Sequence, residues 1–257
     1  MPERLMLFLS ACACLLLAVA CGDDDGGAGN ASPGGDRSGT SSAPILTQPA
    51  SRFAISLDDL VPKTTGGDTG GGYLTDIQST FKLDTKSYAG TRSFDSATDG
   101  EALLSKWSYT GGYETGFEPE TRQQGVLNGA YYINVEVHLF KGEDGSKLMY
   151  KHFEDRLSKS GSKKVTASAV GNESSAWKLV AGKVSDSSID AAYHRIVFRR
   201  GNLVAVVQTW GSDPLMTVDT VRQLSGLIDD KAMGKTSAVE PTPVPTQAVQ
   251  PAPTAAK

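Results

Sequence analysis

Side chains with nucleophilic or metal-binding chemistry are few and scattered in this sequence. The chain has three histidines, His138, His152 and His194, and none has a second histidine at the spacing of a metal-binding pair. No serine stands in a G-x-S-x-G turn, and no S-x-x-K is joined by the other motifs of its enzyme class. We therefore expect no catalytic residue, no metal site and no cofactor, and we interpret the histidines as structural.

Two pairs of neighbouring carboxylates, Asp58-Asp59 and Asp229-Asp230, are the next candidates. Neighbours on a helix point in different directions, and neither pair has the spacing of a calcium-binding loop. We expect both pairs to be solvated surface. A hydrolase whose carboxylates or serines come together from distant positions stays open as an alternative.

Aromatic residues gather in one stretch of the sequence. Amphipathic aromatics can line a groove for a sugar, a lipid or a peptide, although packing in the core is the competing use. Basic residues gather in two places, around Arg156 to Lys164 and around Arg195 to Arg200. They are either ordinary solvated charge or patches that face acidic lipid or wall polymer. The candidate ligand groove consists of Trp107, Tyr109, Tyr113, Tyr131 and Tyr132.

The apolar run Leu5 to Val19 is too short to span a bilayer and fits the apolar region of a signal peptide. The run leads into Leu17-Ala18-Val19-Ala20-Cys21, and the whole segment resembles a bacterial lipoprotein signal peptide. The resemblance implies cleavage before Cys21, a lipid on its sulfur and an extracytoplasmic protein attached to the cell membrane. An ordinary secretory signal and an uncleaved anchor are the alternatives.

The other two cysteines, Cys12 and Cys14, lie inside this leader, so the exported chain has no intrachain disulfide and must rely on an apolar core. The formal net charge of -4 argues against nucleic acid as a partner.

Composition divides the chain into four parts. Residues 1–20 are the predicted signal peptide, and 21–52 form the lipidated cysteine with a flexible Gly- and Ser-rich tether. Residues 53–234 are long enough for one domain with a sizeable core. Residues 235–257 form a disordered Pro- and Ala-rich tail.

Helical patterns cover 96–107, 142–160 and a last segment that opens at Asp213-Pro214 and ends at Gly234. Strands are predicted over 113–122, 127–140, 165–170, 176–180, 191–199 and 203–210, the last two forming a hairpin.

Two strand patterns predict where the core lies. In the strand ending at Phe140, apolar residues alternate with Tyr132, Asn134, Glu136 and His138, so one face is buried and the other is polar or only partly covered. From Val204 to Val207 both faces are apolar, which is typical of a central strand covered on both sides.

Consecutive hairpins with about three helices predict an α+β fold, a single domain in which helices pack on an antiparallel sheet. The run YHRIVFRRGNLVAVVQTWG, with AVGNESSAW upstream, resembles uncharacterised bacterial envelope lipoproteins whose domains are similar to PsbP-like and LpqN-like folds. The resemblance implies an extracytoplasmic accessory or binding domain and no known chemistry. Together with the predicted lipid anchor, we expect a lipid-anchored binding or accessory domain of the cell envelope, with an envelope protein, a lipid or a glycan as candidate ligand. A hydrolase, or an assembly lipoprotein without a small ligand, is the alternative.

Overall fold

The computed structural model describes residues 45–60, 73–91, 93–119, 131–184, 187–213 and 215–236, all within one compact unit, Ser41–Lys257. The predicted signal peptide, Cys21 and nearly all of the tail lie outside these residues. The strands are β1 (Tyr73–Leu83), β2 (Tyr109–Pro119), β3 (Tyr132–Phe140), β4 (Lys163–Val165), β5 (Glu173–Lys183), β6 (Asp190–Arg200) and β7 (Leu203–Asp213). The helices are α1 (Leu57–Leu60), α2 (Thr85–Ala89), α3 (Ala97–Lys106), α5 (Glu143–Lys159) and α6 (Val218–Ala232), with a 3-10 turn η1 (Ala50–Arg52).

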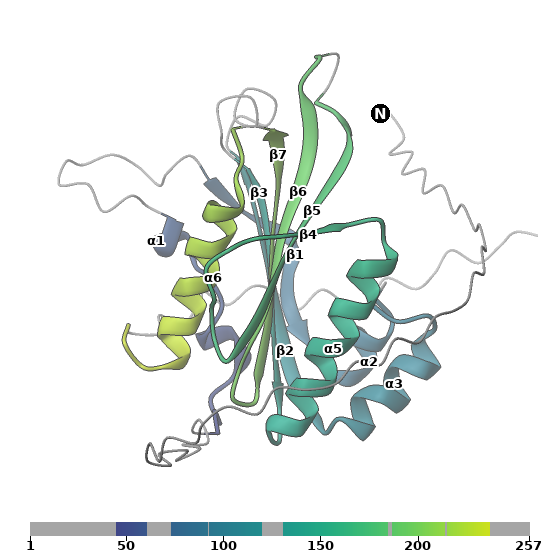
Figure 1. The fold of residues 1–257 in the computed structure, drawn as a ribbon. Coiled ribbons are helices and arrows are strands. Elements are labelled where there is room, and N and C mark those ends of the chain that lie inside the picture. Colours follow the sequence, from purple (N-terminus) through teal and green to yellow (C-terminus); the bar gives the residue numbers. More distant parts are fainter. Residues whose placement is uncertain are drawn as a thin grey trace, which may run out of the picture. The chain divides into compact units, whose positions relative to one another are not determined.

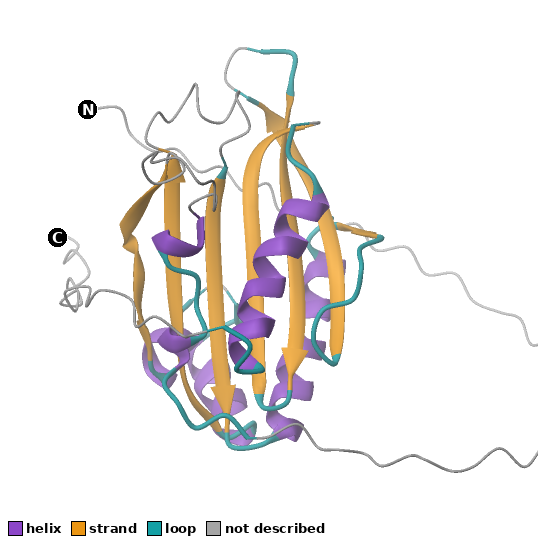
Figure 2. Ribbon diagram, turned by 90° about the vertical axis from the view of Figure 1, so that its left-hand side faces the viewer, coloured by secondary structure: helices purple, strands orange, loops and turns teal. Residues whose placement is uncertain are grey.

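The strands form one sheet in the order β1-β2-β3-β7-β6-β5-β4, and every neighbouring pair is antiparallel. Figure 1 shows the sheet edge-on, with α6 and α1 on one side and α5, α2 and α3 on the other, and Figure 2 shows it from a direction at right angles. Each face of the sheet has its own apolar core. The α+β prediction is confirmed.

Both strand patterns are confirmed except at His138, which is fully buried on the face predicted to be polar or partly covered. Ile133, Val135 and Val137 on β3 are buried under η1 and α6, while Asn134 and Glu136 on the opposite face are only half-buried. β7 lies at the centre of the sheet, and its Val204 to Val207 segment is buried on both faces because α5 and α6 cover it.

The sequence patterns missed β1, α2 and the short elements η1 and α1. The pairing of β1 with β2 shifts between Asp76 and Phe81, and this irregularity interrupts the alternation that marks a strand. The last helix begins at Val218 after its N-cap Thr217, later than predicted, because Asp213 still pairs with Asp190 as the end of β7. β5 is longer than predicted, and of the predicted strand 165–170 only Val165 belongs to β4.

The packed chain extends before Phe53, into the segment assigned to the tether. The side chain of Asn202, at the β6–β7 turn, accepts from the backbone N–H of Leu46 at 2.8 Å and donates to its carbonyl at 3.0 Å. Ala50 is buried in the core under α6. Apolar side chains at 46 and 50 therefore attach this part of the segment to the sheet.

Asp59 and Asp229 are not solvated surface, contrary to the sequence-based expectation. The buried ammonium of Lys231 lies 2.6 Å from the carboxylate of Asp59 and donates to the carbonyl of Ala54. Asp229 accepts two hydrogen bonds from Arg200, both at 2.7 Å. Carboxylates so placed join α6 to the N-terminal segment and to β6, because a buried charge needs a partner.

Among the described residues, none of the helices combines the length and the apolar content that a membrane span requires.

Candidate functional site

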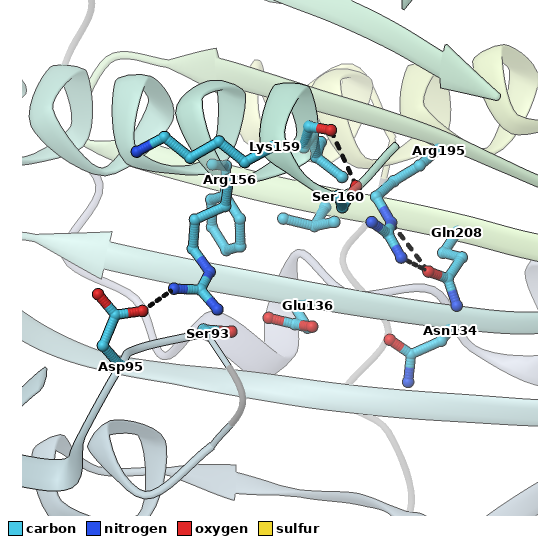
Figure 3. Close-up of a pocket in the computed structure, with 12 residues that line it drawn as sticks. Ser93, Asp95, Asn134, Glu136, Arg156, Lys159, Ser160, Arg195 and Gln208 are labelled. Carbon is cyan, nitrogen blue, oxygen red and sulfur yellow. Dashed lines mark hydrogen bonds and ion pairs between the residues drawn. The ribbon is translucent and has the colours of Figure 1, made fainter. Parts of the chain in front are cut away.

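A pocket of about 470 Å³ opens between the C-terminal half of α5 and the sheet (Figure 3). We call it the α5 pocket. Its floor comes from β3, β7 and β6, and its sides come from α5 and the loop before α3. It is lined by Ser93, Asp95, Asn134, Glu136, Phe153, Arg156, Leu157, Lys159, Ser160, Arg195, Val206 and Gln208.

Asn134, Gln208 and Arg195 form a polar row across three adjacent strands of the floor. Gln208 of β7 is the register partner of both Asn134 and Arg195. Arg195 donates from Nε to Oε1 of Gln208 at 2.8 Å, and its Nη2 donates to the same oxygen (Figure 3). A guanidinium has five N–H donors, so further donors remain for a ligand.

Arg195 has no carboxylate within ion-pair distance among the described residues, although it lies deep in the pocket. Burial lowers the pKa of Arg195, and the charge of Glu136 opposes this effect. The group still carries its positive charge at neutral pH, because arginine starts from so high a value. Among the described residues, the side chain that accepts hydrogen bonds from this guanidinium is the neutral amide of Gln208, and Glu136 acts on it through its charge.

Glu114 on β2 and Glu136 on β3, which we call the acid pair, are register partners on the same face. Glu114 accepts from Nδ2 of Asn134 at 2.8 Å. Burial, and then the neighbouring charge of Glu136, raise the pKa of Glu114 to about 7. Neither carboxylate has a lysine or arginine within ion-pair distance among the described residues.

Glu136 is held from behind by a buried network. Its carboxylate is 3.2 Å from Nε2 of His138, and the hydroxyl of Tyr88 donates to it at 3.4 Å. His138 is fully buried, and its Nδ1 lies 3.4 Å from the hydroxyl of Tyr109. With Nε2–H donating to Glu136, Nδ1 accepts from Tyr109, so the network fixes the orientation of the carboxylate that faces the pocket.

At the rim, Arg156 of α5 contacts Asp95 at 2.8 Å across the pocket side, whereas Lys159 is exposed. Apart from the exposed Lys159, Arg195 and the acid pair are the charged groups of the described part of the site that form no ion pair with a lysine, an arginine or a carboxylate.

The five residues of the candidate groove are not brought together. Tyr113 is buried under η1 and α6, and Tyr131 packs against the same core. Trp107 and Tyr109 pack in the core under α5, and Tyr132 lies half-buried on that face, where its hydroxyl donates to Asp76. None of the five lines the α5 pocket. Alternation along β3 sends Tyr131 and Tyr132 to opposite faces, and the register shift between Tyr109 and Gly111 interrupts the alternation between Tyr109 and Tyr113.

The remaining candidates have structural contacts. His152 lies 2.7 Å from the carbonyl of Ser93, and His194 is buried beside its register partner Thr209. Burial lowers the pKa of His194, and Lys178 lowers it further. Arg199 is buried between Glu143 and Glu173. Of the two basic runs, Arg156, Lys159 and Arg195 reach the α5 pocket.

Within the described ranges, no group of three or more His, Cys, Asp or Glu side chains is placed to hold a metal ion. The arrangement offers instead a fixed guanidinium, two amides and the carboxylate of Glu136 around an open volume, with Glu114 beside Glu136 on the next strand. Such a site binds a polar molecule through charge-assisted and bidentate hydrogen bonds.

No protein-family model matches the chain, and no curated protein matches it. Among solved structures, the chain is similar to the extracellular domain of PknH from Mycobacterium tuberculosis, at 12% sequence identity and a TM-score of 0.40. The match covers 63% of this chain and 82% of that chain.

Proposed function

We propose that this chain is a lipid-anchored, extracytoplasmic binding protein of a bacterial cell envelope, and that its ligand occupies the α5 pocket. The leader and Cys21 support the location, and the pocket supports the binding role. The observation that carries the binding role is Arg195, a half-buried guanidinium that lines the pocket and has no carboxylate within ion-pair distance among the described residues.

An uncompensated charge in a partly desolvated site destabilises the protein unless a ligand or solvent compensates it. Arg195 on β6 and Glu136 on β3 are separated by β7 and form no ion pair, although Glu136 acts on Arg195 through its charge. Perturbed charged groups gathered in a cavity are characteristic of binding sites.

The test is native mass spectrometry of the full-length chain, purified gently from the producing organism, before and after organic extraction. We expect an extra mass that extraction removes. Arg195→Gln should lose that mass. Lys151→Gln, which removes one charge from the exposed face of α5, should keep it. A bare mass in all three proteins would contradict the binding role and favour an assembly lipoprotein without a small ligand.

A glycoside hydrolase is the second candidate, and the acid pair is the observation that favours it. Glycosidases use one protonated carboxyl group as an acid and one ionised carboxylate as a base or nucleophile. A pKa of about 7 allows Glu114 to hold a proton beside the carboxylate of Glu136. Release of a fluorescent alcohol from aryl glycosides, abolished in both Glu114→Gln and Glu136→Gln, would support it. No release above a protein-free control would leave binding as the function.

A further inference from the structure

A second row of side chains lies next to the polar row on the same face of the sheet. Tyr132, Trp210 and Tyr193 are register partners across β3, β7 and β6, and Leu179 of β5 continues the row. We call these three aromatic residues and the leucine together the aromatic row. Tyr132, Trp210 and Tyr193 each lie two positions along their strand from a residue of the polar row, and Leu179 lies two positions from Trp177 on β5. Residues two apart on a strand point to the same face, so both rows face α5.

The aromatic row is held in place but is only half-buried. Tyr193 and Trp210 have ring centroids 6.4 Å apart, and the hydroxyl of Tyr132 donates to Asp76. Tyr132 and Tyr193 belong to no hydrophobic cluster of the described residues, and Trp210 packs against a small one at the tip of the β5–β6 hairpin. α5 ends at Lys159, which lines the pocket over the polar row.

The two rows therefore form one continuous surface. Strands lie about 4.8 Å apart and alternate residues about 7 Å apart, so the aromatic row spans about 14 Å beside the pocket. A small polar ligand in the pocket alone would leave the aromatic rings uncovered. A ligand that reaches both rows must present apolar ring faces on one side and many hydrogen-bonding groups on the other.

Saccharides have this dual character, because a pyranose ring presents C–H faces to aromatic rings and hydroxyls around its edge. Glu136, which lines the pocket, accepts hydrogen bonds from hydroxyls, and Asn134 and Gln208 offer amides for further bonds. A neutral sugar would leave Arg195 without a counterion, whereas a carboxylate on the sugar would bind the guanidinium through two parallel hydrogen bonds. A simple anion would be repelled by the negative charge of the acid pair and would donate no hydrogen bond to it.

Resting on the proposed binding function, we infer that the site takes a carboxylate-bearing saccharide, with the carboxylate on Arg195 and the sugar rings on the aromatic row.

The test uses two disaccharides that differ by one group. N-acetylglucosaminyl-N-acetylmuramic acid carries a lactyl carboxylate that chitobiose lacks. Titration of each into the full-length chain in mild detergent, followed by calorimetry, should show binding of the acidic disaccharide at least about tenfold tighter than chitobiose.

Three variants separate the parts of the site. Arg195→Gln should abolish the preference for the acidic sugar while leaving chitobiose binding within about twofold, since only the carboxylate contact is lost. Trp210→Ala should weaken both sugars about tenfold, because the stacking surface is shared. Lys151→Gln should change neither, and circular dichroism checks that each variant is folded.

Equal binding of the two disaccharides, or a preference that survives Arg195→Gln, would overturn the inference. The inference would also be overturned if neither sugar binds while native mass spectrometry still shows the extra mass that organic extraction removes. In that case the proposed binding function would stand with another ligand. Tight binding of free glutamate, with neither disaccharide competing, would identify the pocket as a zwitterion site and likewise overturn the saccharide. A bare mass and no sugar binding would overturn both proposals.

Discussion

Glu114 is the residue whose charge state the fold changes most clearly. Its folded-state pKa of about 7 lies above the ordinary value of 4.5, so the folded protein binds this proton more tightly than the unfolded chain does. The stabilisation from this proton is fully present below about pH 4.5 and is lost as the pH rises through about 7. We expect Glu114→Gln, which cannot ionise, to remove this loss.

At pH 8 the Glu114→Gln variant should therefore be more stable than the natural protein by about 2–3 kcal/mol, with the difference vanishing near pH 4.5. Urea denaturation at a series of pH values measures this. Glu101→Gln, on the exposed surface of α3, is the matched control and should show no such trend. Parallel stability profiles for Glu114→Gln and the natural protein would contradict the assignment.

At this scale the sequence predicts only part of the site. Alternation along β3 was enough to assign Asn134 and Glu136 to a polar, partly covered face. Arg195 was noticed only as one charge in a basic run, since pairing with Gln208 depends on strand register that a single sequence does not contain. The candidate groove relied on proximity in sequence, and alternation divided its tyrosines between two faces.

Helix α5 is the element on which the pocket depends, and Gly145 determines how closely its first turn approaches the sheet. A Cβ at this position would overlap the carbonyl oxygen of Trp107 and lie 2.9 Å from the ring of Phe140. Backbone cannot move aside as a flexible side chain can. The glycine is therefore required by the close contact, even though glycine is a poor helix former.

We expect Gly145→Ala to destabilise the protein by about 1–3 kcal/mol, because overpacking outweighs the gain in helix propensity. Gly226→Ala in α6 is the matched control. There the nearest atom is the end of the flexible Arg222 side chain, at 3.6 Å, so alanine should stabilise the protein by about 0.5–1 kcal/mol. Urea denaturation of both variants measures the two signs, and stabilisation by both would show that α5 has room at Gly145.

Elements with a regular period were predicted well, and irregular ones were not. The three long helices and the β6–β7 hairpin follow from periodicity and from the turn at Gly201, whose φ of 54° suits glycine. β1 was missed because the irregularity after Asp76 breaks its alternation, and α2 because five residues contain little more than one helical turn.

For the whole molecule, the order of the elements after Ser96 matches the predicted order of helix, strands, helix, four strands and helix. The boundary with the tether is harder to predict. Leu46 is attached by Asn202, 156 positions further along the chain, and local composition carries no information about such a contact. The remaining boundaries of the predicted parts stay predictions.

The proposed place of the molecule depends on one atom, the sulfur of Cys21. A lipid anchor with two or more acyl chains holds a protein on a membrane, since each buried methylene contributes about 0.8 kcal/mol. We expect Cys21→Ser to move the protein out of the membrane fraction or to leave it as a precursor of higher mass. Immunoblots of fractionated cells measure both outcomes. Cys12→Ser, which changes a cysteine inside the predicted leader, should leave size and membrane attachment as they are. If Cys21→Ser stays in the membrane at an unchanged size, attachment does not depend on this sulfur and the lipoprotein assignment is wrong.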